Sequence, residues 1–221
     1  MKAVIIGANR GIGLGLVRKY LQQNWEVWAV SRSLSTELEE STESRLHVIS
    51  GIDVSIEADR TSLVEQLPNE IDQLIHNAGI LRRDSLAHLD ESSILEQLII
   101  NAVSPLQTIQ KLSPLVRTGG KIGIMSSRMG SIADNTSGSM YGYRMSKAAV
   151  NMAGMGLAQD LRSDGIAVFL LHPGYVQTDM TGGRGYITVQ QSVEGLYQRM
   201  QELQFEQTGS FWHTDGTKLT W

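Results

Sequence analysis

Short runs of apolar residues alternate along this chain with longer stretches in which apolar residues recur at every third or fourth position. Short continuous runs indicate strands that are buried on both faces, whereas the wider spacing indicates amphipathic helices. The runs predict strands at residues 2–7, 26–30, 46–50, 71–76, 121–126 and 166–171, and a weaker one at 210–212. The helical patterns lie at residues 13–23, 56–67, 90–115, 141–162 and 189–203.

This alternation of strands and helices predicts the α/β class, with a doubly wound parallel sheet of the Rossmann type. No repeat, charge block or Pro/Ser-rich linker divides the chain, so we expect a single domain over residues 1–221. Pro105 and Pro114 are expected to kink or end parts of the long helix at 90–115. Ligands of such sheets bind beyond the carboxyl ends of the strands, so the residues that follow each strand are candidates for a site.

Composition and charge narrow the possible functions. With 19 Lys and Arg against 23 Asp and Glu, the formal net charge is −4, which disfavours binding to nucleic acid. The chain has no Cys, which excludes disulfides and Cys-ligated metals, and its histidines show no metal-ligand spacing. The longest apolar run, residues 166–171, is too short to span a membrane, and residues 3–6 are too short for a signal sequence. We therefore expect a cytoplasmic protein.

The first predicted strand runs into a glycine-rich segment, Gly7-Ala8-Asn9-Arg10-Gly11-Ile12-Gly13, which opens the first helix. Glycines permit the sharp turn and let backbone N–H groups approach a pyrophosphate at the helix N-terminus. The alternative is a turn that serves only close packing of helix and strand.

The end of the second predicted strand carries Ser31 and Arg32, where an NAD-binding chain would have a carboxylate. Arg10 lies in the glycine-rich segment. A guanidinium pairs well with phosphate oxygens, so the two arginines favour NADP(H) over NAD, unless both are ordinary surface residues.

Three further motifs follow later strands. Asn77-Ala78-Gly79 comes after the fourth strand and Ser126-Ser127 after the fifth. Tyr143 and Lys147 are four residues apart in the next predicted helix and share one face of it. A neighbouring ammonium lowers the pKa of a Tyr and makes it usable as a general acid or base. A single Tyr-x-x-x-Lys spacing, however, often arises by chance.

The ordered set of these motifs resembles the short-chain dehydrogenase/reductase family over nearly the whole chain. The residues that match are Gly7–Gly13, Asn77–Gly79, Asn101, Ser127, Tyr143, Lys147, Pro173, Gly174 and Thr178. Within the family, residues 126–149 resemble the Sniffer-type carbonyl reductases and the C-factor group. Two positions depart from the family pattern: Ile6 replaces the usual Thr or Ser, and His76 replaces the usual Asn.

The resemblance implies a catalytic role for four residues. Tyr143 would donate a proton to the substrate oxygen, and Lys147 would lower the pKa of Tyr143 and bind the nicotinamide ribose. Ser127 would hydrogen-bond the developing alkoxide. Asn101 would hold a water that relays protons to Lys147.

The resemblance also implies which residues bind NADP(H). These are Gly7, Asn9, Arg10, Gly11, Ile12, Ser31, Arg32, Asp53, Val54, Asn77, Ala78, Gly79, Tyr143, Lys147, Pro173, Gly174, Val176 and Thr178. Asp53 is also a candidate N-cap of the helix that follows it.

The chain is expected to act on a small carbonyl substrate and to form a homodimer or homotetramer. The predicted helix at residues 141–162 is apolar on most sides, which fits the paired-helix interface of the family. Residues 179–187 form a short segment with three glycines, which offers few contacts for specificity.

Two classes of function remain. The first is an NADPH-dependent carbonyl reductase, and the second is a nucleotide-bound signalling protein of the C-factor kind with incidental turnover. The complete set of Asn101, Ser127, Tyr143 and Lys147 favours the enzyme, because a protein that only binds a nucleotide has no need of the Ser and Tyr.

Overall fold

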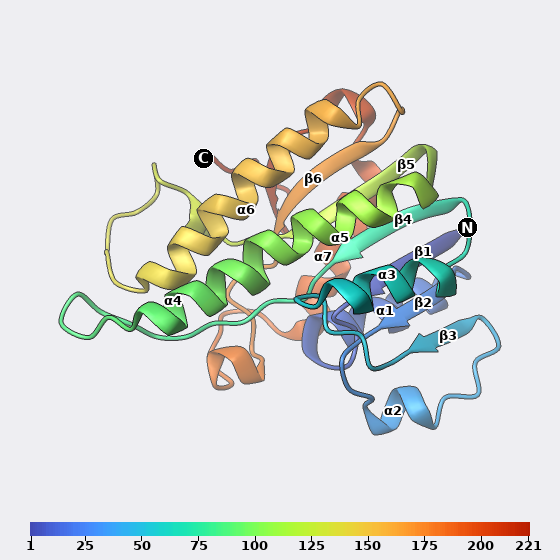
Figure 1. Ribbon diagram of the computed structural model, residues 1–221, viewed down its shortest axis with the longest axis horizontal. Helices are drawn as coiled ribbons and strands as arrows, with labels where there is room; N and C mark the ends of the chain where they lie inside the picture. The colour runs from blue at the N-terminus through green and yellow to red at the C-terminus, as the bar shows by residue number, and fades with distance from the viewer.

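Seven parallel strands form the central sheet of the computed structural model, which describes residues 1–221 (Figure 1). The strands lie in the order β3-β2-β1-β4-β5-β6-β7, so the direction of winding reverses between β1 and β4. This confirms the predicted doubly wound sheet, including the weak seventh strand. The bounds are β1 Lys2–Ile6, β2 Glu26–Val30, β3 Leu46–Ile49, β4 Ile71–His76, β5 Val116–Met125, β6 Ala167–His172 and β7 Ser210–His213.

Helices cover both faces of the sheet. Helices α1 (Gly11–Gln22) and α7 (Val189–Glu202) pack together on one face, and α3 (Glu57–Gln66), α5 (Ser104–Leu112) and α6 (Tyr141–Asp160) lie on the other (Figure 1). None of the helices is both long and apolar enough to cross a lipid bilayer.

Strand β1 shows why the strands are continuous apolar runs. Val4 and Ile6 contribute to the core on the α3–α5–α6 face, whereas Ala3 and Ile5 contribute to the core on the α1–α7 face. Successive side chains of a strand point to opposite faces, so a strand covered on both faces needs apolar residues throughout.

The long helix expected at residues 90–115 is interrupted. It consists of α4 (Glu91–Leu98), a π-helical turn (Ile99–Val103), α5 and a final 3₁₀ turn (Ser113–Leu115). Pro105, near the start of α5, lacks the N–H that would bind the carbonyl of Asn101, and Pro114 lies in the last turn. Both prolines therefore lie where the regular helix changes, as the sequence predicted.

Two features of the fold escaped the sequence prediction. Helix α2 (Thr36–Glu39) is a single turn capped by Ser35, with only Leu38 buried, so it has no visible periodicity. Strand β5 begins at Val116 rather than at residue 121. The apolar pattern missed its first half because Arg117-Thr118-Gly119-Gly120 is polar and glycine-rich.

Candidate active site

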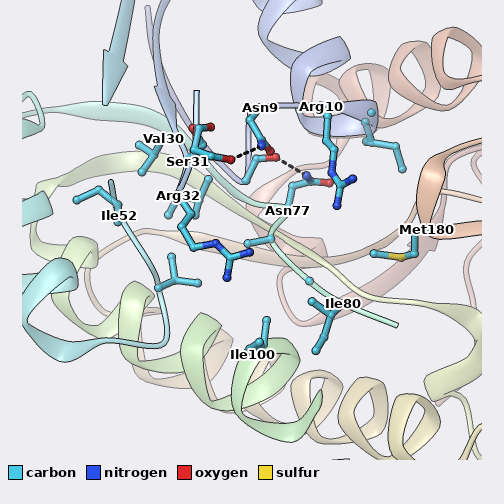
Figure 2. Close-up of a pocket in the computed structure, with 18 of the residues that line it drawn as sticks. Asn9, Arg10, Val30, Ser31, Arg32, Ile52, Asn77, Ile80, Ile100 and Met180 are labelled. Carbon is cyan, nitrogen blue, oxygen red and sulfur yellow. Dashed lines mark hydrogen bonds between the residues drawn. The ribbon is translucent and has the colours of Figure 1, made fainter. Parts of the chain in front are cut away.

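A cavity of about 420 Å³ opens beyond the carboxyl ends of the central strands, where the strand order reverses (Figure 2). Doubly wound sheets bind their ligands at this position. The cavity brings together most of the residues expected to bind a cofactor. These are Gly7, Asn9, Arg10, Gly11, Ile12, Ser31, Arg32, Asp53, Val54, Asn77, Ala78, Gly79 and Thr178.

The glycine-rich loop is pressed against the loop that follows β4. Gly7 has a φ of +81°, and a Cβ there would lie 2.7 Å from the backbone nitrogen of Ala78. A Cβ at Gly13 would collide with the carbonyl oxygen of Gly7, which accepts a hydrogen bond of 2.9 Å from Asn77 Nδ2. The glycines therefore allow the close packing of loop and helix that was considered as an alternative for this motif. The same turn also forms one wall of the cavity.

Helix α1 presents its positive end to the cavity. It begins at Gly11 with no side-chain cap and no acidic residue in its first turn. Gly11 and Ile12 line the cavity, so free backbone N–H groups and the helix dipole adjoin it. An anionic group such as a pyrophosphate fits this end of the cavity.

Arg10 and Arg32 both line the cavity (Figure 2). Each has an acidic partner that the sequence did not indicate. Arg10 Nη1 lies 3.0 Å from Asp179 Oδ2, and Arg32 Nη1 lies 3.4 Å from Asp53 Oδ2. Both guanidinium groups are largely exposed, and exposed ion pairs contribute little to stability. Either arginine can therefore exchange its carboxylate for a phosphate at small cost, which fits a phosphorylated dinucleotide.

Asp53 does not cap the helix that follows it. Its carboxylate accepts hydrogen bonds from the backbone and the hydroxyl of Ser55, at 2.9 and 2.6 Å, and Ile56 precedes the first residue of α3. The cap considered for Asp53 is therefore wrong, and this carboxylate instead faces the cavity and Arg32.

The sequence motifs did not indicate all of the residues that line the cavity. The additional residues are Ile6, Val30, Ser33, Ile52, Ile80, Ile100, Asp179 and Met180. Ile52 and Ile80 adjoin motif residues, so adjacency could have indicated them. Ile100 likewise precedes Asn101, whereas Met180 comes from the loop after β6 and no motif marks it.

Beyond Gly79, the cavity adjoins a group of buried polar side chains. A Cβ at Gly79 would lie 3.7 Å from Lys147 Nζ and 3.1 Å from Asn101 Oδ1. Lys147 Nζ lies 5.7 Å from the centroid of the Tyr143 ring, and the Ser127 side chain acts on the Tyr143 phenol to lower its pKa. The structure thus brings all four expected catalytic residues to one place.

Burial is the largest influence on the pKa values of Tyr143 and Lys147. It raises the pKa of Tyr143 to about 12, and the smaller effect of Ser127, which lowers this pKa, does not offset it. It lowers the pKa of Lys147 to about 8. Burial thus outweighs the lowering of the Tyr143 pKa that was expected from Lys147, whose ammonium donates to the carbonyl of Met125 at 2.9 Å.

The loop that carries Ser127 is docked on α6. Ser126 Oγ donates a hydrogen bond of 2.6 Å to Asn151 Oδ1, and Asn151 Nδ2 donates to the carbonyl of Gly130. A Cβ at Gly130 would lie 2.5 Å from the carbonyl carbon of Lys147, so the two backbones are in close contact. Asn151 therefore holds the residues on both sides of Ser127, a role that no motif indicated.

Asn101 lies in the π-helical turn and is buried. Its amide binds both backbone groups of Ile80 at 2.8 Å, and its Nδ2 also donates to Ser146 Oγ at 3.0 Å. The residue therefore connects the loop after β4 to α6. Its expected role in holding a water stays a prediction.

Pro173, Gly174 and Val176 do not line the cavity, although Thr178 does. Gly174 has a φ of +87°, and a Cβ there would lie 2.7 Å from Ile187. Val176 is buried and forms an isolated bridge with Ile187. These residues close the base of the loop at 175–187, whose Tyr186 nitrogen also donates to the carbonyl of Tyr175 at 2.7 Å.

Comparison with known sequences gives consistent matches. The family model described as short chain dehydrogenase matches residues 1–185. A dehydrogenase of 1-hydroxy-2-glutathionyl-2-methyl-3-butene from Rhodococcus sp. (strain AD45) is 38% identical, over 99% of this chain and 98% of that protein. The C-signal of Myxococcus xanthus is 40% identical, over 68% of this chain and 93% of that protein.

Solved structures with the same architecture cover the whole chain. The carbonyl reductase Sniffer of D. melanogaster superposes with a TM-score of 0.93 at 32% identity, covering 100% of this chain and 99% of that one. An NADPH-bound carbonyl reductase from chicken fatty liver superposes with a TM-score of 0.91 at 30% identity, covering 100% and 98%.

Proposed function

This chain belongs to the short-chain dehydrogenase family, and from that premise we propose that it reduces the carbonyl group of a small aldehyde, ketone or dione with NADPH. The observation that carries the proposal is the position of Tyr143, Ser127 and Lys147 directly beyond Gly79 at the inner end of the cavity. The similar solved structures include an NADPH-bound carbonyl reductase, which supports the same reaction and cofactor.

In this proposal the residues of the cavity hold the cofactor. The N-terminus of α1 and the glycine-rich loop bind its pyrophosphate, and Arg10 and Arg32 bind the 2′-phosphate of the adenosine ribose. When bound, NADPH supplies the hydride that reduces the carbonyl carbon.

Tyr143 is the proton donor. Its raised pKa keeps the phenol protonated at neutral pH, which is the form that a general acid must have before it donates. Ser127 donates a hydrogen bond to the substrate oxygen as negative charge develops there. Lys147 binds the nicotinamide ribose, and the low pKa of its amine allows it to return a proton to Tyr143 through a water held at Asn101.

The proposal includes a homo-oligomer in the cytoplasm. Helix α6 exposes Met145, Met152 and Met155, and the neighbouring helical segment exposes Leu95, Ile99, Val103 and Leu106 at intervals of three and four residues. Exposed apolar side chains on adjacent helices are typical of a face that pairs with a second copy. Sedimentation at micromolar concentration should give a dimer or tetramer, and a monomer would contradict this part of the proposal.

The variant Tyr143→Phe tests the mechanism. We expect the rate of NADPH oxidation to fall by about a hundred- to ten-thousandfold, because proton transfer in the transition state is worth about 10²–10⁴-fold. The Kd for NADPH, measured by calorimetry, should change by less than about twofold, since the phenol proton is needed only in the chemical step. Turnover at the wild-type rate would remove Tyr143 from the mechanism.

A further inference from the structure

Helix α6 begins without a cap from its own flanking sequence. Met140, the residue before the helix, has a φ of +56° and makes no side-chain hydrogen bond to the first turn. The first four N–H groups of a helix need partners from elsewhere. Tyr143 is the third residue of α6, so the position of its phenol depends on how this first turn is held.

Asp84, in the loop between β4 and α4, supplies the missing partners. Its two carboxylate oxygens accept hydrogen bonds from the backbone nitrogens of Tyr141 and Gly142, the latter at 2.9 Å. Its carbonyl oxygen accepts from Ser139 Oγ at 2.9 Å and from the nitrogen of Met140 at 3.2 Å. A single residue, more than fifty positions away in sequence, therefore holds four consecutive residues that lead into the catalytic turn.

The loop that carries Asp84 is itself anchored to the neighbouring helix. Gln97 on α4 is completely buried, and its Oε1 accepts a hydrogen bond of 2.9 Å from the nitrogen of Arg82. Helix α4 lies against the start of α6 at the same end of the molecule (Figure 1). The chain of contacts thus runs from α4 through Arg82 and Asp84 to the first turn of α6.

Gly142 makes this close approach possible. A Cβ at this position would lie 2.5 Å from Gln97 Nε2 and 3.2 Å from Asp84 Oδ2. Glycine is otherwise unfavourable inside a helix, so its presence in the catalytic turn fits a requirement for the carboxylate to reach the backbone.

We propose that Asp84 is a positioning residue for Tyr143: by capping the first turn of α6 from another loop, it holds the phenol where it donates its proton. The carboxylate also complements the positive end of the helix. This inference rests on the proposed role of Tyr143 as the proton donor.

The test compares two aspartates that cap neighbouring helices. Asp84→Ala removes the cap of α6, and Asp90→Ala removes the cap of α4, where Asp90 accepts a hydrogen bond from the nitrogen of Ser92. A displacement of about 1 Å costs roughly a hundredfold in rate, and partial fraying of one turn costs less, so we expect Asp84→Ala to lower kcat about ten- to a hundredfold. The Kd for NADPH should change by less than about twofold, because Asp84 lies outside the cavity lining. Asp90→Ala should retain the wild-type kcat.

A conservative variant and a reference variant complete the experiment. Asp84→Asn keeps one oxygen that accepts from the helix, so its kcat should lie between those of the wild type and Asp84→Ala, and it serves as the test if the Ala variant does not fold. The inference would be overturned by a wild-type kcat in folded Asp84→Ala. If that variant is unfolded, a wild-type kcat in Asp84→Asn would overturn it instead. An equal loss of kcat in Asp90→Ala would overturn it as well. If Tyr143→Phe retains activity, the proposed function fails instead, so the two failures are distinguishable.

Discussion

The ionisable side chains of the site lie on the surface at the cofactor end and in the interior at the catalytic end. Arg10 and Arg32 are about three-quarters exposed and pair with single carboxylates, whereas Tyr143 and Lys147 are less than a tenth exposed. The buried ammonium of Lys147 donates a hydrogen bond to the backbone carbonyl of Met125, on another element. Surface ion pairs can be exchanged at little cost, but a buried polar group that loses its partner is expensive.

This difference predicts where changes act. Substitutions at the cofactor end should alter which nucleotide binds and leave the chemistry intact. Apart from those at Lys147, which binds the nicotinamide ribose in the proposed function, substitutions at the catalytic end should alter turnover or the pH dependence of stability and leave nucleotide affinity intact. The experiments below are arranged from the largest expected effect to the smallest.

The largest effect is expected from His76, at the end of β4, whose ring nitrogens are buried and have no hydrogen-bond partner. Burial, with a smaller contribution from Lys147, lowers the pKa of His76 from 6.5 to about 3. Between pH 6.5 and 3 the unfolded chain therefore binds a proton that the folded protein does not, so stability falls as the pH falls. From pH 7 to pH 4 this residue should cost about 3 kcal/mol of unfolding free energy.

Denaturant unfolding at the two pH values tests this expectation. His76→Asn should lose less stability than the wild type between pH 7 and pH 4, by about that amount. His88→Asn, which removes an exposed histidine from a loop, is the matched control and should behave as the wild type. Identical losses in all three proteins would show that His76 does not take up the proton on unfolding.

At the cofactor end, Arg32→Asp should shift the preference from NADPH toward NADH. Hydrogen bonds to charged groups contribute about 1.5–3 kcal/mol, so the ratio of kcat/KM for the two cofactors should change roughly ten- to a hundredfold. Arg18→Asp, on α1 but outside the cavity lining, should leave the ratio unchanged. An unchanged ratio in Arg32→Asp would mean that Arg32 does not read the 2′-phosphate.

The smallest effect is expected from Asn151, which holds the loop around Ser127. Loss of a neutral hydrogen bond costs about 1 kcal/mol, so Asn151→Ala should lower kcat about fivefold with little change in the Kd for NADPH. Ser126→Ala removes the partner of the same bond, and the double variant should lose no more than Asn151→Ala alone. Additive losses would indicate that the two residues act separately.

The same contrast explains what the sequence could predict. The glycine-rich loop, Arg32 and the segment at 77–79 follow directly from strand ends, and a local motif sufficed to place them around one cavity. The partners of the buried residues come from other elements. Asp84 meets α6, and Asn151 meets the loop of Ser127, only after the sheet has brought these segments together. No spacing in the sequence marks either contact.

The pKa of Tyr143 shows a second limit. The spacing of Tyr143 and Lys147 correctly placed both side chains on one helical face, and it suggested that the ammonium would lower the phenol pKa. The structure instead raises that pKa, because burial outweighs the other influences on the phenol. Burial is a property of the assembled fold, so the sequence could indicate the Tyr143–Lys147 pair but not which influence on the Tyr143 pKa is larger.

The central claim, that this chain is a carbonyl reductase, is tested most directly by NADPH oxidation with a panel of aldehydes, ketones and diones. We expect turnover of several unrelated compounds, with diones and quinones reacting best. Activated carbonyls are more electrophilic and need less stabilisation of the developing alkoxide from Ser127 and Tyr143. Discrimination among them should be weak, since a single methylene contact is worth only about 1–3 kcal/mol. Tight NADPH binding without turnover of any compound would contradict the claim and favour a nucleotide-bound signalling protein.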